Sequence, residues 1–160
     1  MKHLTIVLLA GLVASGCGGS SSSPVSPSPG SLTTLSSVGG TWSGSSADSS
    51  GQEQMVWTVA QDGSNVTGTM SFSDTGRGML GNGSMRGSVN GRTVTFHMDV
   101  PNGGFSGMRS SCSMDMDGQA TISDDGHTMT GTYSGNMSGM MSQMQSCGDA
   151  MNNGRFTLTR

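Results

Sequence analysis

From residue 38 onwards the chain alternates apolar and polar residues, and clusters of turn residues interrupt the alternation at short intervals. A period of two places the apolar residues on one face, which is the pattern of a half-buried β-strand. We predict eight strands, at residues 38–44, 53–61, 66–72, 84–89, 94–100, 112–122, 129–133 and 156–158. No helical period lies between them, and 27 glycines in 160 residues exclude a fold dominated by helices.

Short and long connections alternate along these predicted strands. Tight turns are expected at 62–64, 90–91 and 124–126, and Asn90-Gly91 is a strong hairpin signal. The other connections are longer, at roughly 45–52, 73–82, 101–110 and 135–152. Alternate connections of an up-and-down meander lie at opposite ends, so the tight turns form a closed end. The long loops form the other end, which we call the mouth.

A short motif of the form apolar, polar, Gly, hydroxyl, apolar occurs three times, at 66–70, 85–89 and 129–133. The glycine falls on the apolar face each time, where it allows a sheet to bend sharply or to close. The alternative explanation is that glycine is simply abundant in this chain. We predict an all-β domain over 38–160, an eight-stranded antiparallel up-and-down barrel.

The first residues of the chain have the layout of a secretory signal. A short charged start precedes an apolar stretch and three small residues, and Cys17 follows. Small residues directly before a cysteine resemble the lipobox of bacterial lipoproteins, although Ala14 stands where leucine is usual. The resemblance implies that 1–16 are removed and that Cys17 is acylated, which anchors the protein to a membrane. The alternative is an ordinary signal peptide with an incidental cysteine.

Residues 17–37 have no apolar period and are rich in Gly, Ser and Pro, which is typical of a flexible linker. Gly18 after the cysteine resembles the sorting signal for the outer membrane, so we expect a bacterial cell-envelope location there. Without Lys2 the mature chain carries six arginines against ten acids, and its net charge is −4. This scattered charge makes nucleic acid a poor partner.

Two cysteines remain in the domain, Cys112 and Cys147. Cysteines in an oxidising envelope pair by default, so we predict a disulfide between them. The alternative is a pair of free thiols in a metal site. The bridge would link two neighbouring loops of the mouth.

The sequence Gly40-Thr41-Trp42 at the first strand of an eight-stranded meander resembles the Gly-x-Trp start of lipocalins and avidin-like barrels. In lipocalins this tryptophan fills the closed end and an arginine near the chain end packs over it, a role that the resemblance gives to Arg155 or Arg160. No helix is expected after the last strand, unlike in lipocalins. Two tryptophans are too few for an avidin-type biotin site.

No arrangement of residues supports catalysis. The mature chain has only His97 and His127, and neither is expected near a mouth loop. Acyl transfer needs a nucleophile, a base and an orienting group together. We therefore expect a monomeric protein that is not an enzyme and has no cofactor.

Methionines gather in the sequence that is expected to form the mouth: Met108, Met137, Met140, Met141 and Met144. The spacing from Met137 to Met144 resembles that of periplasmic copper-handling proteins, and soft thioethers select Cu(I). The alternatives are an adaptable apolar lid, packing within the loop, or no role.

These observations leave three functional hypotheses. The first is a non-enzymatic module that binds a small apolar ligand or a protein partner at the mouth. The second is a structural or inhibitory surface lipoprotein that binds another protein. The third is binding of Cu(I) by the methionine-rich loop.

Overall fold

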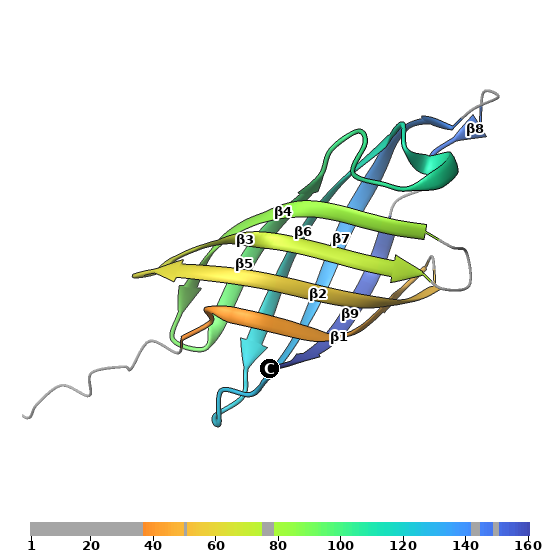
Figure 1. Cartoon of the computed structure of the whole chain (residues 1–160). Helices are drawn as coiled ribbons and strands as arrows, with labels where there is room; N and C mark the ends of the chain where they lie inside the picture. Colours follow the sequence, from red (N-terminus) through yellow and green to blue (C-terminus); the bar gives the residue numbers. More distant parts are fainter. Residues whose placement is uncertain (1–36, 50, 75–78, 142–144, 149–150) are drawn as a thin grey trace, which may run out of the picture. The chain divides into compact units, whose positions relative to one another are not determined.

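The computed structural model describes residues 37–49, 51–74, 79–141, 145–148 and 151–160, and these form a β-barrel (Figure 1). Eight strands follow one another around the barrel: β1 Gly40–Asp48, β2 Gly51–Asp62, β3 Asn65–Asp74, β4 Met79–Asn90, β5 Thr93–Val100, β6 Cys112–Ile122, β7 Thr128–Met141 and β9 Met151–Thr159. The predicted signal, Cys17 and the linker to residue 36 lie outside the described residues.

Each strand of the barrel pairs in antiparallel fashion with the next, from β1 to β7. β9 pairs with both β7 and β1 and closes the barrel. The predicted eight-stranded antiparallel barrel is confirmed. A ninth strand, β8 (Gln145–Ser146), is a two-residue addition that pairs only with the end of β7.

The strands are longer than the sequence indicated, and the correction concerns the mouth. Residues 45–48 belong to β1, residues 73–74 end β3, and β7 continues to Met141. These stretches, and residues 79–83 of β4, contain glycines and serines that favour loops in the sequence. They continue the ladder because their neighbours supply the bulk, as Phe72 does opposite Gly81. Between β5 and β6 the predicted loop is present and includes a short 3-10 helix, η1 (Gly107–Arg109).

Aromatic rings of the core lie against inward-facing glycines on neighbouring strands. Four rings each have a glycine as a direct cross-strand partner: Phe72 with Gly81, Phe96 with Gly118, Phe156 with Gly131, and Tyr133 with Gly154. A Cβ added to any of these glycines would lie within 2.5 Å of its ring. The rings therefore occupy the volume that side chains at the glycines would need, as in aromatic rescue of strand glycines.

The glycines of the repeated motif face inward as predicted, and they bring strands very close together. A Cβ at Gly68 would lie 2.2 Å from the carbonyl oxygen of Thr58, and one at Gly87 would lie 2.1 Å from that of Thr95. No other residue tolerates such an approach, so these glycines allow the tight curvature of a closed sheet.

Trp42 is fully buried at the closed end, and its indole N–H donates to the carbonyl of Val38 at 2.8 Å. Arg160, not Arg155, packs over it, with Cζ 4.6 Å from the ring centroid. Arg160 also donates to the carbonyls of Gly126 and Gly39. Arg155 is exposed because it alternates with the inward-facing Phe156 on β9.

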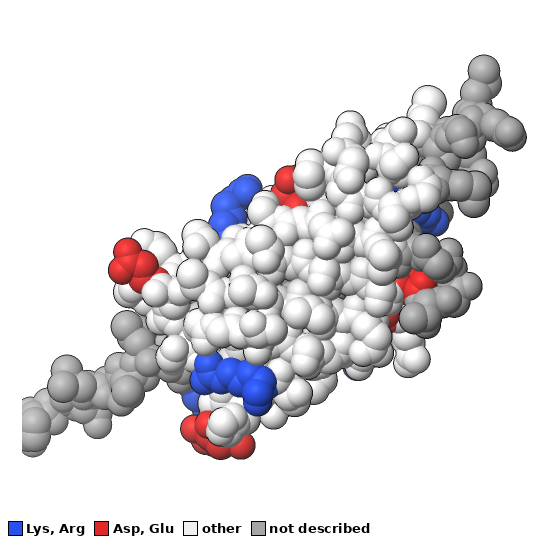
Figure 2. All heavy atoms as spheres, in the orientation of Figure 1, with Lys and Arg blue, Asp and Glu red and all other residues white. Residues whose placement is uncertain are grey.

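The outer wall carries mostly uncharged hydroxyl and amide side chains, and the face in Figure 2 shows only scattered charges. Within the described residues there is no helix long and apolar enough to cross a membrane.

Candidate functional site

The loop between β5 and β6 folds over the mouth. Phe105 is 3% exposed and meets Phe72 edge to face, with ring centroids 5.6 Å apart. The backbone N–H of Asn82 donates to the carbonyl of Gly104 at 2.8 Å, and that of Ser106 donates to the carbonyl of Leu80 at 2.9 Å. These contacts hold the loop against β4 and cover the apolar interior.

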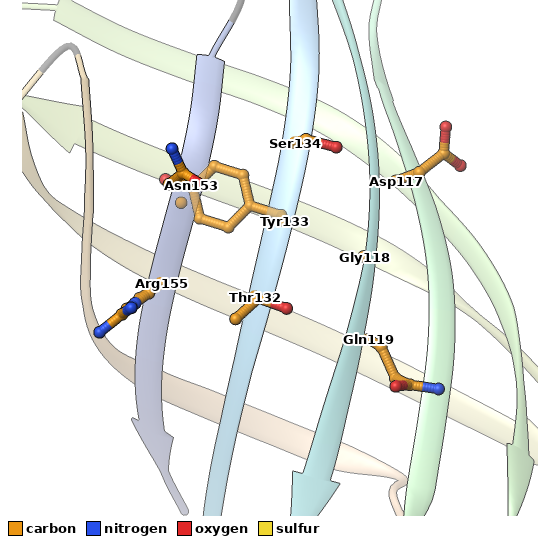
Figure 3. A pocket seen from close by; sticks show the side chains of 9 residues that line it. Asp117, Gly118, Gln119, Thr132, Tyr133, Ser134, Asn153 and Arg155 are labelled. Carbon is orange, nitrogen blue, oxygen red and sulfur yellow. The ribbon is translucent and has the colours of Figure 1, made fainter.

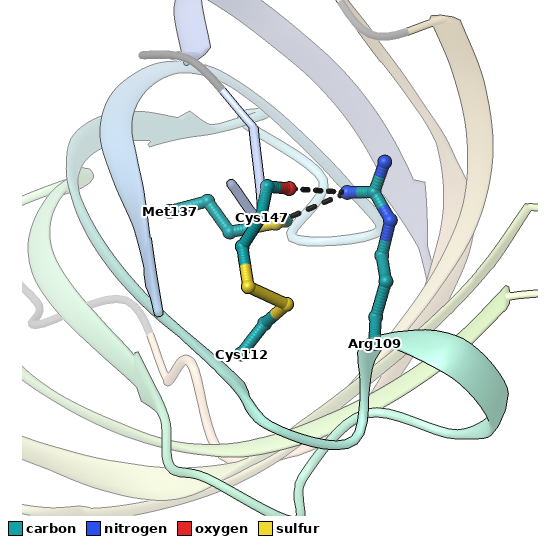
Figure 4. The surroundings of a disulfide bond; sticks show 4 residues. All are labelled: Arg109, Cys112, Met137 and Cys147. Carbon is teal, nitrogen blue, oxygen red and sulfur yellow. Dashed lines mark hydrogen bonds between the residues drawn. A yellow bond between two sulfur atoms is a disulfide. The ribbon is translucent and has the colours of Figure 1, made fainter. Parts of the chain in front are cut away.

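The predicted disulfide between Cys112 and Cys147 is confirmed. It joins the first residue of β6 to the segment just after β8, and both cysteines are almost fully buried (Figure 4). The bridge closes a loop with a sequence separation of 35 residues, which the chain-entropy description values at about 3–4 kcal/mol. Two separate parts of the mouth are thus cross-linked.

Arg109 of η1 reinforces the same region. Its Nη1 donates to the carbonyl oxygen of Cys147 at 3.0 Å and to the sulfur of Met137 at 3.1 Å (Figure 4). This residue was not predicted from the sequence. The only sequence signal for its role is its position three residues before Cys112, and this signal is weak without a structure.

The structure describes the side chains of two of the candidate methionines. Met137 is half-buried beside Arg109, whereas Met140 is 69% exposed. The side chains of Met108 and Met141 and the whole of Met144 lie outside the described residues. The guanidinium of Arg109, 3.1 Å from the sulfur of Met137, opposes the binding of another cation at that sulfur.

Buried apolar side chains line the described interior. Trp57 lies at the centre of an aromatic cluster, with ring centroids 5.0 Å from Phe96 and 4.9 Å from Phe156. On the mouth side of this cluster, Met85, Met98 and Met116 are direct neighbours across β4, β5 and β6, and all are buried. Adaptable methionines fill the space that branched residues occupy in other cores.

Tyr133 joins the interior to the mouth end of β1. Its hydroxyl donates to a carboxylate oxygen of Asp48 at 2.8 Å. Burial, and then the hydrogen bond to Asp48, raise the pKa of Tyr133 well above its ordinary value. The phenol therefore stays protonated and acts as a donor at all physiological pH values.

The buried indole Nε1 of Trp57 has no hydrogen-bond partner among the described residues. This side chain faces the interior of the barrel. A buried donor without a partner costs about 1–3 kcal/mol, so Nε1 is a place where a ligand could gain binding energy.

The histidines lie away from the mouth. His97 is on the outer wall, where its Nδ1 is 2.9 Å from a carboxylate oxygen of Asp117 and its Nε2 is 3.8 Å from one of Asp115. His127 is exposed in the turn at the closed end. In that turn, hydrogen bonds from the Ser123 hydroxyl and the His127 backbone lower the pKa of Asp125.

In the described part of the chain, no three His, Cys, Asp or Glu side chains are grouped so as to hold a metal ion. No protein family, curated protein or solved structure matches the chain. The resemblance to lipocalins and avidin-like barrels is therefore one of architecture, an eight-stranded closed antiparallel barrel.

Proposed function

We propose that this protein is a lipid-anchored envelope protein whose barrel is a non-enzymatic binding module, and that it engages a protein partner at the rim of the mouth. The lipobox-like sequence at Cys17 supports the anchor. The start of β1 lies at the closed end, so the linker would join the barrel at the end opposite the mouth.

The observation that carries the proposal is the cross-linked mouth above a buried aromatic cluster. Three sets of contacts tie together the described part of this end: those of the loop with Phe105, the bridge between Cys112 and Cys147, and those of Arg109. A surface that is already ordered loses less conformational entropy when it binds. Exposed apolar side chains stand at the same end, Leu80 at 53% and Met140 at 69%.

Cross-linking and capture from envelope extract test this proposal. We expect wild type to recover a specific partner and the Met140→Asp variant to lose it, because a carboxylate would have to be buried in the contact. Val56→Asp is the matched control, an apolar-to-acid change at a 38% exposed position on the outer wall of β2. Equal recovery by all three proteins would exclude an interface that includes Met140.

The second candidate is a small ligand inside the barrel, and the unpartnered Trp57 Nε1 favours it. Such a ligand would need an apolar body and an acceptor for the indole N–H, and Phe105 would have to move to admit it. Native mass spectrometry of freshly purified protein would detect a bound molecule. A mass equal to that of the bare chain, with unchanged tryptophan fluorescence on extraction, would count against this candidate.

The anchor has its own test. Cys17→Ser should release the protein from the membrane into the soluble fraction, because acylation needs the thiol. Continued membrane association of the variant would show that Cys17 is not the attachment point.

The copper hypothesis is tested by titration of Cu(I) into wild type and into a Met140→Leu, Met141→Leu, Met144→Leu variant. The charge of Arg109 beside Met137 leads us to expect equal weak binding by both proteins. A large loss of affinity in the variant would establish the copper site instead.

A further inference from the structure

Two hollows lie side by side on the outer wall, away from the mouth, and they share Asp117. One measures about 690 Å³ and extends over β3, β4 and β5. The other measures about 540 Å³ and extends over β6, β7 and β9 (Figure 3). They share a lining residue and follow one another around the barrel, and we call the path along them the furrow. From β4 to β9 it runs for about 19 Å along the curved wall, at the usual spacing of neighbouring strands.

The strand register explains the furrow. Its floor follows an inward-facing row in which glycines and aromatic residues alternate across neighbouring strands: Gly87, Phe96, Gly118, Tyr133 and Gly154. These rings point into the barrel, and the glycines bring neighbouring strands close together, so little side-chain bulk lies along this row. Outward-facing residues stand on both sides of it and form two rims.

The rim on the mouth side is a row of directly paired residues, Arg86, His97, Asp117 and Ser134. The contact between His97 Nδ1 and Asp117 indicates that Nδ1 carries the proton when the ring is neutral. Nε2 lies 3.8 Å from a carboxylate oxygen of Asp115. The rim therefore offers a guanidinium, an imidazole, a carboxylate and a hydroxyl in sequence.

The opposite rim is also a row of directly paired residues, Ser88, Thr95, Gln119, Thr132 and Arg155. All five are exposed. Figure 3 shows Gln119 and Thr132 on one side of Gly118, and Asp117 and Ser134 on the other.

A β-bulge shapes the end of the furrow. The pairing of β7 with β9 shifts by one residue between Tyr133 and Gly135, and Asn153 on β9 has φ of 57°. This left-handed conformation is uncommon for a residue with a side chain. Asn153 lines the hollow at this point, where it adds an amide to the rims.

We propose that this furrow binds a linear, uncharged oligosaccharide. Hydroxyl, amide, guanidinium and imidazole groups in two facing rows supply the mixture of donors and acceptors that sugar hydroxyls require. The floor offers the backbone of the partly exposed Gly87 and Gly118 to the C–H faces of sugars. The site is separate from the mouth and does not depend on the proposed function there.

Other occupants fit this surface less well. An extended peptide usually binds by adding a strand to a free sheet edge, and the eight strands of the closed barrel leave no such edge. Two arginines with an aspartate between them give too little positive charge for nucleic acid, whose affinity comes mainly from phosphate contacts. The length and polarity of the furrow suit a chain of sugars.

Calorimetric titration of the full mature chain with chitohexaose, cellohexaose and maltohexaose tests the proposal. We expect at least one of the three to bind. A double variant, Gln119→Ala with Thr132→Ala, should weaken that binding about tenfold or more, because two rim hydrogen bonds are lost. The matched control is Gln52→Ala with Thr58→Ala, the same changes at exposed positions of β2, and it should bind within about twofold of wild type.

A second variant and a second measurement do not depend on losing a contact. Ser134→Trp adds bulk to one rim at an exposed position and should abolish binding by obstructing the furrow. Backbone amide shifts of wild type on addition of the sugar should map to β4–β7 and β9. Absence of binding by all three sugars, equal binding by the rim and control variants, or shifts confined to the mouth would each overturn the proposal.

Discussion

Replacement of Gly81 by alanine, alone and together with Phe72→Leu, tests whether paired rings and glycines build this core. A Cβ at Gly81 would lie 2.1 Å from Cζ of Phe72, and its three nearest atoms all belong to that ring. Because ordinary contact begins at 3.4 Å, the ring would have to withdraw by about 1.3 Å. The ring is not free to do so, since it is 4% exposed and packs against Phe105.

The magnitudes follow from the geometry. Overpacking of a filled core costs about 1–3 kcal/mol, and alanine recovers about 0.5–1 kcal/mol by restricting the unfolded chain. Gly81→Ala should therefore lower the free energy of unfolding by about 1–2 kcal/mol. Phe72→Leu removes the three clashing atoms and should cost about 1–2 kcal/mol by itself. In the Phe72→Leu background the alanine meets no ring and should cost nothing, so the two changes should couple by the full cost of Gly81→Ala alone, about 1–2 kcal/mol.

Equilibrium unfolding in urea, followed by tryptophan fluorescence with the disulfide intact, measures all four proteins of this cycle. Gly68→Ala is the control partner, because its obstruction is the backbone oxygen of Thr58, which Phe72→Leu does not move. We expect Gly68→Ala and Phe72→Leu to be additive. Additive costs for Gly81→Ala and Phe72→Leu as well would refute the idea that the ring occupies the volume left by the glycine.

Three further predictions concern the ends of the barrel. Unfolded, unreduced protein should show no thiol from Cys112 or Cys147, and reduction should lower the free energy of unfolding by about 3–4 kcal/mol; two free thiols would overturn the bridge. Arg160→Gln should lower the free energy of unfolding in urea by about 1–2 kcal/mol, because the contacts with the Trp42 ring and with backbone carbonyls are lost. Arg155 is exposed, so Arg155→Gln should change the same free energy by no more than about 0.5 kcal/mol. Because burial raises the pKa of Tyr133, the native state keeps a proton that the unfolded state loses above about pH 10, so stability should fall there by up to about 1.4 kcal/mol per pH unit. Tyr133→Phe should abolish that part of the decline, and tyrosinate absorbance can follow it cleanly because the chain has one tyrosine.

The strands of the barrel were predictable because each carries a clear period of two and ends at recognisable turns. β6, for example, has the predicted bounds of 112–122. The mouth was less predictable, because the strand segments that extend into it are rich in glycine and serine. In the sequence alone such residues are typical of loops. Only the pairing of β3 with β4 shows that Gly81 is a strand residue opposite Phe72.

The candidate sites show the same limit. The bridge between Cys112 and Cys147 followed from counting cysteines, but the contacts of Arg109 depend on how the loop folds. Trp42 was correctly placed under an arginine, yet the choice between Arg155 and Arg160 depended on where the alternation of β9 ends. Residue types pointed to each contact, and the structure identified the partners.

The furrow was out of reach of sequence reasoning because no local pattern encodes it. Ser88 and Arg155 are far apart in the sequence. They belong to one row only because β4, β5, β6, β7 and β9 pair in succession. The glycines that shape its floor are also those that accept rings inside, as Gly118 accepts Phe96. A mutation that restores bulk at Gly118 would therefore disturb the core and the outer surface together. Selection for an outer binding surface and selection for a closed, filled barrel would act on the same glycines, which is a physical reason for a chain of this size to contain so many.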